Sequence, residues 1–322
     1  MSKFPGTMLM RNRPSAWLLP LFLVTTLCAH DLLFGQSTPS SSEDSSRLTY
    51  HSSVSEVRLV FFATDEHNHL VEGLQKNDFA VVDDERVIRE FRSFTRSDVI
   101  KLDVVVLIDS SESVLPYFEQ EITEVQQLIL QSPWGSGDNV SVLSFSGEEA
   151  HLICAGNCGS SFTSDRLASL PRGGPTPLFD AVEIATNLLI QRRQPDVWPV
   201  IILFSDGEDT ISRASLHGTL EKILTSEVQI YAVDVGSPER PSNGTATLQR
   251  IAEDSGGRRV PIIEGVVKVF SDVIEDLHSA RVVTYLPPES GTAFHSIRIL
   301  PTRNLKLQFR CRRGYYSRGG AQ

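Results

Sequence analysis

The chain has 322 residues, of which 40% are hydrophobic, and its formal net charge at pH 7 is −10. This length exceeds that of one average domain, so the chain can bury a substantial core and hold one large domain beside a smaller one. The acidic balance argues against nucleic acid as a partner.

The first 36 residues are expected to be a secretory signal. Lys3, Arg11 and Arg13 precede a mostly apolar stretch over residues 16–29. A positive region followed by about 14 apolar residues is typical of such a signal, whereas a membrane span needs about 20. We therefore expect a secreted protein, or one of the periplasm or cell envelope, with an uncleaved signal anchor as the alternative.

A flexible linker and a short β segment are expected next. Residues 37–54 are rich in Ser and Thr, which is typical of a linker without packed elements. Residues 55–98 contain short β-rich runs bounded by turn-forming residues. The runs that predict strands are Val57–Ala63, Phe79–Val82 and Ile88–Phe94.

The central region, residues 101–281, alternates strand and helix patterns. Such alternation predicts an α/β domain with a mostly parallel sheet and helices on both faces. The clearest helices run from Pro177 to Gln191 and from Val266 to Ala280, where apolar residues recur at steps of three and four. The predicted strands are Leu102–Asp109, Asn139–Ser146, Val200–Ser205, Gln229–Val235 and Arg258–Pro261.

The last segment, residues 282–318, returns to β character. Strands are expected at Val282–Tyr285, Ile297–Leu300 and Leu305–Arg310. Each flank of the central domain is too small to bury its own apolar face, so we expect 282–318 to pair with 55–98. The central domain is then an insertion in a small β module, as is tolerated when the ends of the inserted domain lie close together.

The same C-terminal segment is basic and carries no acidic residue from Arg298 onward. A basic strand in an acidic protein can meet an anionic polymer, a lipid surface or an acidic partner. The other interpretation is an edge strand protected by its charge against aggregation. The residues are Arg298, Arg303, Lys306, Arg310, Arg312, Arg313 and Arg318.

Three cysteines remain after the signal region. The spacing of Cys154 and Cys158 allows a small disulfide loop in an oxidising compartment and leaves Cys311 over. The alternative is that all three are reduced or buried. A zinc site is not expected, because three cysteines at this spacing supply too few ligands.

Oxygen-bearing side chains follow two of the predicted central strands. Asp109, Ser111 and Ser113 form a D-x-S-x-S motif after the first strand, and Asp206 follows the strand that ends at Ser205. Thr176 lies just before the predicted helix. Each residue alone has a simpler interpretation as a turn or cap residue. Together they suit a hard divalent cation at the carboxyl ends of the strands, where open α/β sheets bind ligands.

This set, D-x-S-x-S followed by Thr and then Asp, resembles the metal-ion-dependent adhesion site (MIDAS) of von Willebrand factor A (vWA) domains. The resemblance implies a vWA-type doubly wound sheet and a Mg²⁺ site, with Mn²⁺ or Ca²⁺ as alternatives. An ion bound by few carboxylates stays electrophilic, so an acidic side chain of a protein partner can complete its shell. The implied ligands are Asp109, Ser111, Ser113, Thr176 and Asp206.

Softer signatures extend the resemblance over roughly residues 55–318. The stretches 70–74, 77–79 and 313–316 are similar to those of secreted bacterial proteins with a vWA-like domain, known chiefly from Acidobacteria. This resemblance indicates the architecture more than the function.

The sequence contains none of the common catalytic motifs for nucleophilic hydrolysis, nucleotide binding or zinc-dependent proteolysis. Hydrolysis at a metal ion also needs a positioned base, and no residue stands out for that role. We therefore expect a secreted, adhesion-like binding module that is not an enzyme. The alternatives are a metal-dependent hydrolase or phosphoryl-transfer enzyme, and a structural component of the cell envelope.

Overall fold

The computed structural model describes residues 56–131, 134–156, 158, 164–236, 242–262, 266–288 and 293–317. The predicted signal, 1–36, and the predicted linker, 37–54, lie outside the described residues. No helix in the described part of the chain is long and apolar enough to cross a membrane.

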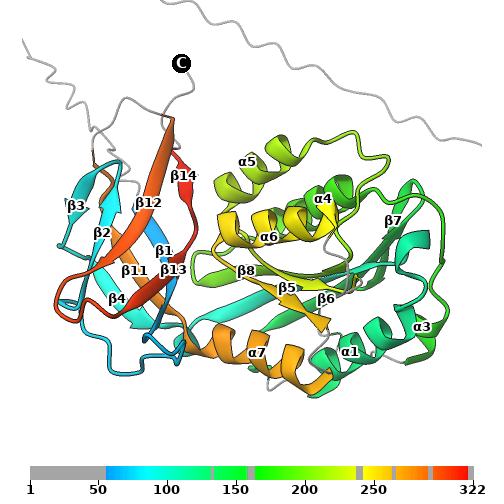
Figure 1. The fold of residues 1–322 in the computed structure, drawn as a ribbon, viewed down its shortest axis with the longest axis horizontal. Helices are drawn as coiled ribbons and strands as arrows, with labels where there is room; N and C mark the ends of the chain where they lie inside the picture. Colours follow the sequence, from blue (N-terminus) through cyan, green and yellow to red (C-terminus); the bar gives the residue numbers. More distant parts are fainter. Residues whose placement is uncertain are drawn as a thin grey trace, which may run out of the picture. The chain divides into compact units, whose positions relative to one another are not determined.

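A six-stranded sheet forms the centre of the α/β part (Figure 1). Its strand order is β10-β9-β8-β5-β6-β7, and all neighbours are parallel except the antiparallel pair β6 and β7. The central strands are buried on both faces, which is why their sequences read as continuous apolar runs. The bounds are β5 Lys101–Asp109, β6 Asn139–Ser146, β7 Glu149–Cys154, β8 Val197–Ser205, β9 Gln229–Asp234 and β10 Arg259–Pro261.

Helices cover both faces of this sheet (Figure 1). Successive side chains of β5 alternate between the two faces: Val104 and Val106 pack in one core cluster and Val105 in the other. The first face carries α1 (Phe118–Gln131), α3 (Ser164–Ala168) and α7 (Val266–Ser279). The second carries α4 (Leu178–Gln191), α5 (Leu216–Ser226) and α6 (Asn243–Ser255).

The predicted α/β class with a mostly parallel sheet is confirmed. Strand β6 and helix α4 agree with the predicted ranges to within one residue. The antiparallel edge strand β7 was not predicted, because none of its residues is fully buried and its sequence lacks a strong apolar pattern. A disulfide joins Cys154 at the end of β7 to Cys158, with a Cα–Cα distance of 5.8 Å. Cys311 is free, and burial raises the pKa of its thiol to about 12.

The flanking segments form two small antiparallel sheets, with orders β13-β1-β11-β4 and β14-β12-β2-β3. Strands of the two flanks pair directly: β1 with β11 and β13, and β2 with β12. The apolar faces of both sheets share one core, in which the rings of Phe61 and Phe79 lie 4.9 Å apart. The bounds are β1 Val57–Thr64, β2 Phe79–Asp83, β3 Arg86–Ile88, β4 Ser93–Arg96, β11 Arg281–Tyr285, β12 Phe294–Pro301, β13 Gln308–Cys311 and β14 Gly314–Tyr316.

Two predicted strands of these flanks are wrong in detail. The range Ile88–Phe94 is not one strand, because β3 ends at Ile88 in one sheet and β4 begins at Ser93 in the other. The predicted strand from Leu305 begins three residues later at Gln308, and the Leu305 side chain is exposed. The short strand β14 was not predicted at all.

Three arginines of the basic C-terminal flank form ion pairs with acidic residues of the α/β part. Arg310 contacts Asp276 of α7 at 2.6 Å, Arg312 contacts Glu227 at 3.5 Å, and Arg313 contacts Asp254 at 3.7 Å. Neither interpretation made from the sequence, an anionic partner or a protected edge strand, included this internal pairing. These three arginines attach the β module to the α/β part.

Asp276 is the central residue of this attachment, because it pairs with both Arg258 and Arg310 and is itself buried. We expect Asp276→Ala to lower the free energy of unfolding by about 3–5 kcal/mol, since it removes the buried carboxylate that Arg258 and Arg310 share. Urea denaturation measures the effect. The control is Asp254→Ala, whose arginine partners are exposed, with an expected loss of about 0–1 kcal/mol. Equal losses in the two variants would contradict this role.

Candidate metal site

The predicted ligands lie on three loops at the carboxyl edge of the parallel sheet. Asp109 is the last residue of β5, and Asp206 directly follows the last residue of the neighbouring strand β8. Thr176 lies two residues before α4. Parallel pairing of β5 with β8 brings the ends of both strands to the same edge, which is where the sequence predicted the site.

Asp109 is fully buried and held by serine hydroxyls. Ser111 donates from its backbone N–H and from its hydroxyl to Oδ1, at 3.0 and 2.5 Å. Ser205 donates from its hydroxyl to Oδ2 at 2.7 Å. Ser113 Oγ lies 3.3 Å from Ser111 Oγ, so the two serines of the motif face the same point. These contacts fix the carboxylate of Asp109 and the hydroxyls of the D-x-S-x-S turn as one unit.

The loop that carries Thr176 is tied to the D-x-S-x-S turn through its backbone. Gly173 N–H donates to Ser110 O at 2.8 Å, and Glu112 N–H donates to Gly174 O at 3.0 Å. Both glycines have positive φ, of 91° and 84°, a conformation that other residues adopt only with strain. The sequence Gly-Gly before Pro175 is therefore needed for this loop to reach the turn.

Thr176 is also joined to the loop that follows Asp206. Its backbone N–H donates to Thr210 Oγ1 at 2.7 Å, and Thr210 N–H donates back to Thr176 O at 2.8 Å. Asp206 Oδ1 accepts the N–H of Glu208 at 3.0 Å, which orients that carboxylate. The hydrogen bonds thus link the three loops into one surface, and Thr176 and Asp206 are both buried.

The residue after Asp206 must be a glycine, for two reasons seen at Gly207. Its φ is 80°, and a Cβ atom there would lie 2.1 Å from the carbonyl oxygen of Gly244 in α6. The N-terminus of α6 therefore packs directly on the backbone beside Asp206.

The electrostatics of the site fit a bound cation. Burial and, to a smaller extent, the charge of Asp206 raise the pKa of Asp109 to about 7, although the hydrogen bonds from Ser111 and Ser205 act to lower it. In the described part of the chain, neither aspartate forms an ion pair with Lys or Arg. Two carboxylates and three hydroxyls are the oxygen donors that Mg²⁺ takes, so the residues present fit the ion.

Sequence reasoning missed one acidic residue, Glu121. It lies in the first turn of α1, is fully buried, and neither of its carboxylate oxygens has a hydrogen-bond partner among the described residues. Burial raises the pKa of Glu121, and the charges of Asp109 and Asp206 raise it further, so Glu121 lies within the field of the site. Nothing in the sequence distinguished it from the acidic residues that commonly favour the first turn of a helix.

A match to the model of the von Willebrand factor type A domain covers residues 103–275, which is more than half of the chain. The chain belongs to this family. The vWA family includes binding modules that depend on a metal ion at a MIDAS, and its members generally mediate contacts between proteins.

Two relatives are magnesium-chelatase 60 kDa subunits. The subunit of Cereibacter sphaeroides is 29% identical over 155 residues, which is 46% of this chain and 28% of the relative. That of Rhodobacter capsulatus is 29% identical over 124 residues, which is 38% of this chain and 22% of the relative. The chain thus matches less than a third of the length of either relative.

Several solved structures are similar to part of the chain at low sequence identity. An aerotolerance-related membrane protein from Bacteroides fragilis has a TM-score of 0.44 and 18% identity, covering 55% of this chain and 98% of its own. BatB from Bacteroides thetaiotaomicron has a TM-score of 0.43 and 18% identity, covering 54% and 98%. Proximal thread matrix protein 1 from the mussel byssus, described with a zinc-occupied MIDAS motif, has a TM-score of 0.45 and 15% identity, covering 62% and 50%.

At such identities and TM-scores these likenesses concern the fold alone. The relatives named above come from other organisms than Acidobacteria, so the predicted resemblance to secreted Acidobacterial proteins stays a prediction.

The raised pKa of Asp109 predicts how pH acts on the metal-free protein. A carboxyl whose pKa rises from 3.8 to about 7 on folding stabilises the fold fully below about pH 4, and this stability is lost as the pH rises through about 7. We expect the melting temperature without metal to fall between about pH 5 and about pH 8, and Mg²⁺ to restore it at the higher pH. Asp109→Asn should show a smaller fall and no response to Mg²⁺. A wild-type melting temperature that does not change with pH would contradict this.

A comparison of Glu121 with Glu124 distinguishes a role at the metal site from the general stability cost of burying a carboxyl group. Both side chains are buried, and among the described residues their carboxylate oxygens have no hydrogen-bond partner. Burial raises the pKa of Glu124, and neither Asp109 nor Asp206 is a cause of that shift. We expect Glu121→Met and Glu124→Met each to raise the free energy of unfolding by about 1–3 kcal/mol. Only Glu121→Met should weaken Mg²⁺ binding in calorimetric titration. Equal Mg²⁺ affinity in the two variants would exclude Glu121 from the site.

Proposed function

We propose that this chain is a secreted, non-enzymatic binding module in which one Mg²⁺ ion coordinates a carboxylate of a protein partner. The observation that carries the proposal is the joining of three loops by hydrogen bonds around Asp109, a buried carboxylate with no Lys or Arg partner in the described part of the chain. The ligands, directly or through water, would be Asp109, Ser111, Ser113, Thr176 and Asp206.

The charge of this ligand set leaves the ion able to accept another anion. Mg²⁺ takes six oxygen ligands in a near-octahedral array, and five side chains leave at least one position for water or a partner. Two carboxylates balance the charge of the ion without exceeding it, and hydroxyls add none. Mn²⁺ accepts the same donors, whereas Ca²⁺ favours six to eight oxygens and a larger site.

The residues around the site make partner binding dependent on the metal. Glu112, within the D-x-S-x-S motif, and Glu208, two residues after Asp206, are both exposed. Without an ion, these two carboxylates and the ligands present a negative surface that repels an acidic partner. With the ion bound, its free position attracts a partner carboxylate.

Two observations support action outside the cytoplasm. The predicted signal at residues 1–36 would direct the chain to export, and the Cys154–Cys158 disulfide is typical of an oxidising compartment. The partner is then a protein of the envelope or of the cell exterior that offers an Asp, a Glu or a C-terminal carboxylate.

The test is binding of an acidic peptide to the immobilised chain in Mg²⁺ and in EDTA. We expect binding in Mg²⁺ alone, a loss of at least about tenfold in Asp109→Ala, and no such loss in Asp165→Ala, an exposed aspartate of α3 that is not among the predicted ligands. Equal binding with and without chelator would reject the mechanism. Turnover of a phosphate or ester substrate that disappears in Asp206→Ala would support the enzymatic alternative. A Mg²⁺-dependent melting temperature without any binding would support a structural role.

A further inference from the structure

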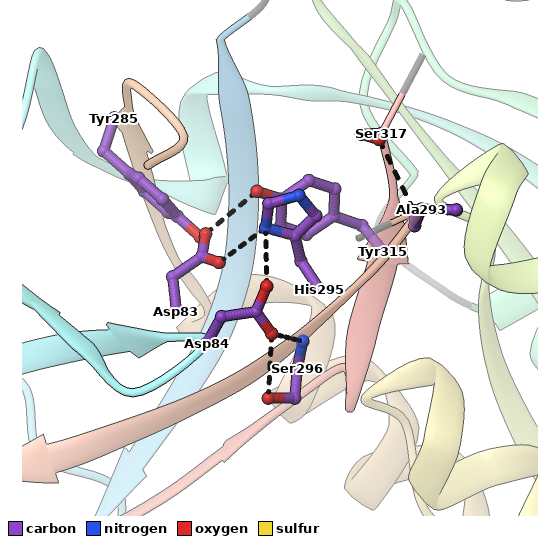
Figure 2. Close-up of polar contacts among 8 residues, drawn as sticks. All are labelled: Asp83, Asp84, Tyr285, Ala293, His295, Ser296, Tyr315 and Ser317. Carbon is purple, nitrogen blue, oxygen red and sulfur yellow. Dashed lines mark hydrogen bonds and ion pairs between the residues drawn. The ribbon is translucent and has the colours of Figure 1, made fainter. Parts of the chain in front are cut away.

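A second cluster of side chains of the types that bind metal ions lies in the β module, where the two flanks of the chain meet (Figure 2). Asp83 is the last residue of β2, Asp84 lies in the turn between β2 and β3, and His295 belongs to β12. Strand β12 pairs with β2, which brings His295 beside Asp83, 212 positions away in the sequence, and beside Asp84. This cluster is on different elements from the candidate MIDAS.

Two carboxylates converge on one nitrogen of His295. Its Nδ1 lies 3.0 Å from Asp83 Oδ1 and 3.2 Å from Asp84 Oδ2. A ring nitrogen carries at most one proton, and one N–H cannot point straight at two oxygens. A cation at the centre of the three atoms satisfies all of them.

The remaining oxygen of each carboxylate is held by hydrogen-bond donors. Asp83 Oδ2 accepts the hydroxyls of Tyr285 and Tyr315 at 2.8 and 2.9 Å. Asp84 Oδ1 accepts the backbone N–H of Ser296 at 2.9 Å and its hydroxyl at 3.3 Å. Each carboxylate therefore has one oxygen fixed and the other directed at Nδ1, as Figure 2 shows. Donors of this kind orient the ligands of metal ions in proteins.

The rest of the environment fixes the imidazole ring and leaves a charge to be balanced. The ring of His295 stacks on that of Tyr315, with centroids 4.6 Å apart, and its side chain is only 3% exposed. Asp83 is fully buried, and His295 is its one ion-pair partner among the described residues. A buried carboxylate needs a positive partner, which here is either a protonated imidazole or a metal ion.

The donor set indicates the class of metal. The three ligand atoms, one nitrogen and two oxygens, all lie within 4.8 Å of one another. Ligands at about 2.0–2.1 Å from a Zn²⁺ ion lie roughly 3.3 Å apart in a tetrahedron, close to the separations of Nδ1 from the two oxygens. Imidazole with carboxylates suits Zn²⁺ and its neighbours among the transition metals better than Mg²⁺.

We propose that Asp83, Asp84 and His295 bind a transition-metal ion of the Zn²⁺ class, which ties β2 to β12 and so joins the two flanks of the chain. The half-buried side chain of Asp84 lies toward solvent, where water can occupy the fourth position of the ion. This site does not depend on the function proposed for the MIDAS.

The test begins with the full chain carrying Asp109→Ala, so that metal bound at the candidate MIDAS does not contribute. After removal of metal with a chelator, Zn²⁺ is titrated by calorimetry. We expect one bound equivalent and a higher melting temperature. Asp84→Asn and His295→Gln should each lose that equivalent. Asn keeps the positive φ of 46° at position 84 without added strain, so this variant tests the ligand and not the fold.

The exposed cluster of Asp65, His67 and His69 supplies the matched control. The double variant His67→Ala, His69→Ala should keep the bound equivalent. Zinc-edge X-ray absorption should show a single imidazole among oxygen ligands. Tyr285→Phe, which removes one of the donors to Asp83, should weaken Zn²⁺ binding by about 10- to 100-fold.

Three results would each overturn the proposal. The first is that the Asp109→Ala chain binds no stoichiometric Zn²⁺. The second is that Asp84→Asn leaves Zn²⁺ binding unchanged, and the third is that the zinc absorption spectrum shows no imidazole ligand. In these cases the cluster is a hydrogen-bonded ion pair between a protonated His295 and the two aspartates.

Discussion

The structure of the candidate site depends on one buried charge, the carboxylate of Asp109 at the end of β5. Two serine hydroxyls and a backbone N–H hold its oxygens, yet within the described residues no cationic side chain balances its charge. Burial therefore favours the protonated acid in the free protein and a divalent cation in the loaded one. The glycines at 173, 174 and 207 are the backbone positions that let the neighbouring loops approach this point.

The β module also contains buried carboxylates whose charge needs a positive partner. Its two flanks are far apart in sequence, and ion pairs of Asp276 and the C-terminal arginines attach them to the helices. Within the module, His295 and two aspartates meet at the β2–β12 pairing. A cation at the candidate MIDAS and a cation at the cluster of Asp83, Asp84 and His295 would each offset buried negative charge. Metal binding and stability are therefore linked at both sites.

The sequence predicted those features that follow from periodicity and order. The parallel strands, helix α4 and the positions of Asp109 and Asp206 at strand ends all come from apolar runs with polar residues directly after them. Features that depend on contacts between residues far apart in the sequence were not predictable. The chain passes from one small sheet to the other between Ile88 and Ser93. This crossing, the burial of Glu121 and the contact of Asp83 with His295 depend on which segments pack together in the fold.

Proton release on metal binding tests the central claim most directly. Mg²⁺ is titrated at about pH 6.5 by calorimetry in two buffers with different ionisation enthalpies, which gives the number of protons released. If the ion replaces the proton on Asp109, we expect net release at this pH, decreasing toward zero above about pH 8, and none in Asp109→Asn. Mg²⁺ binding with no proton release at either pH, or binding that Asp109→Asn leaves unchanged, would contradict the account.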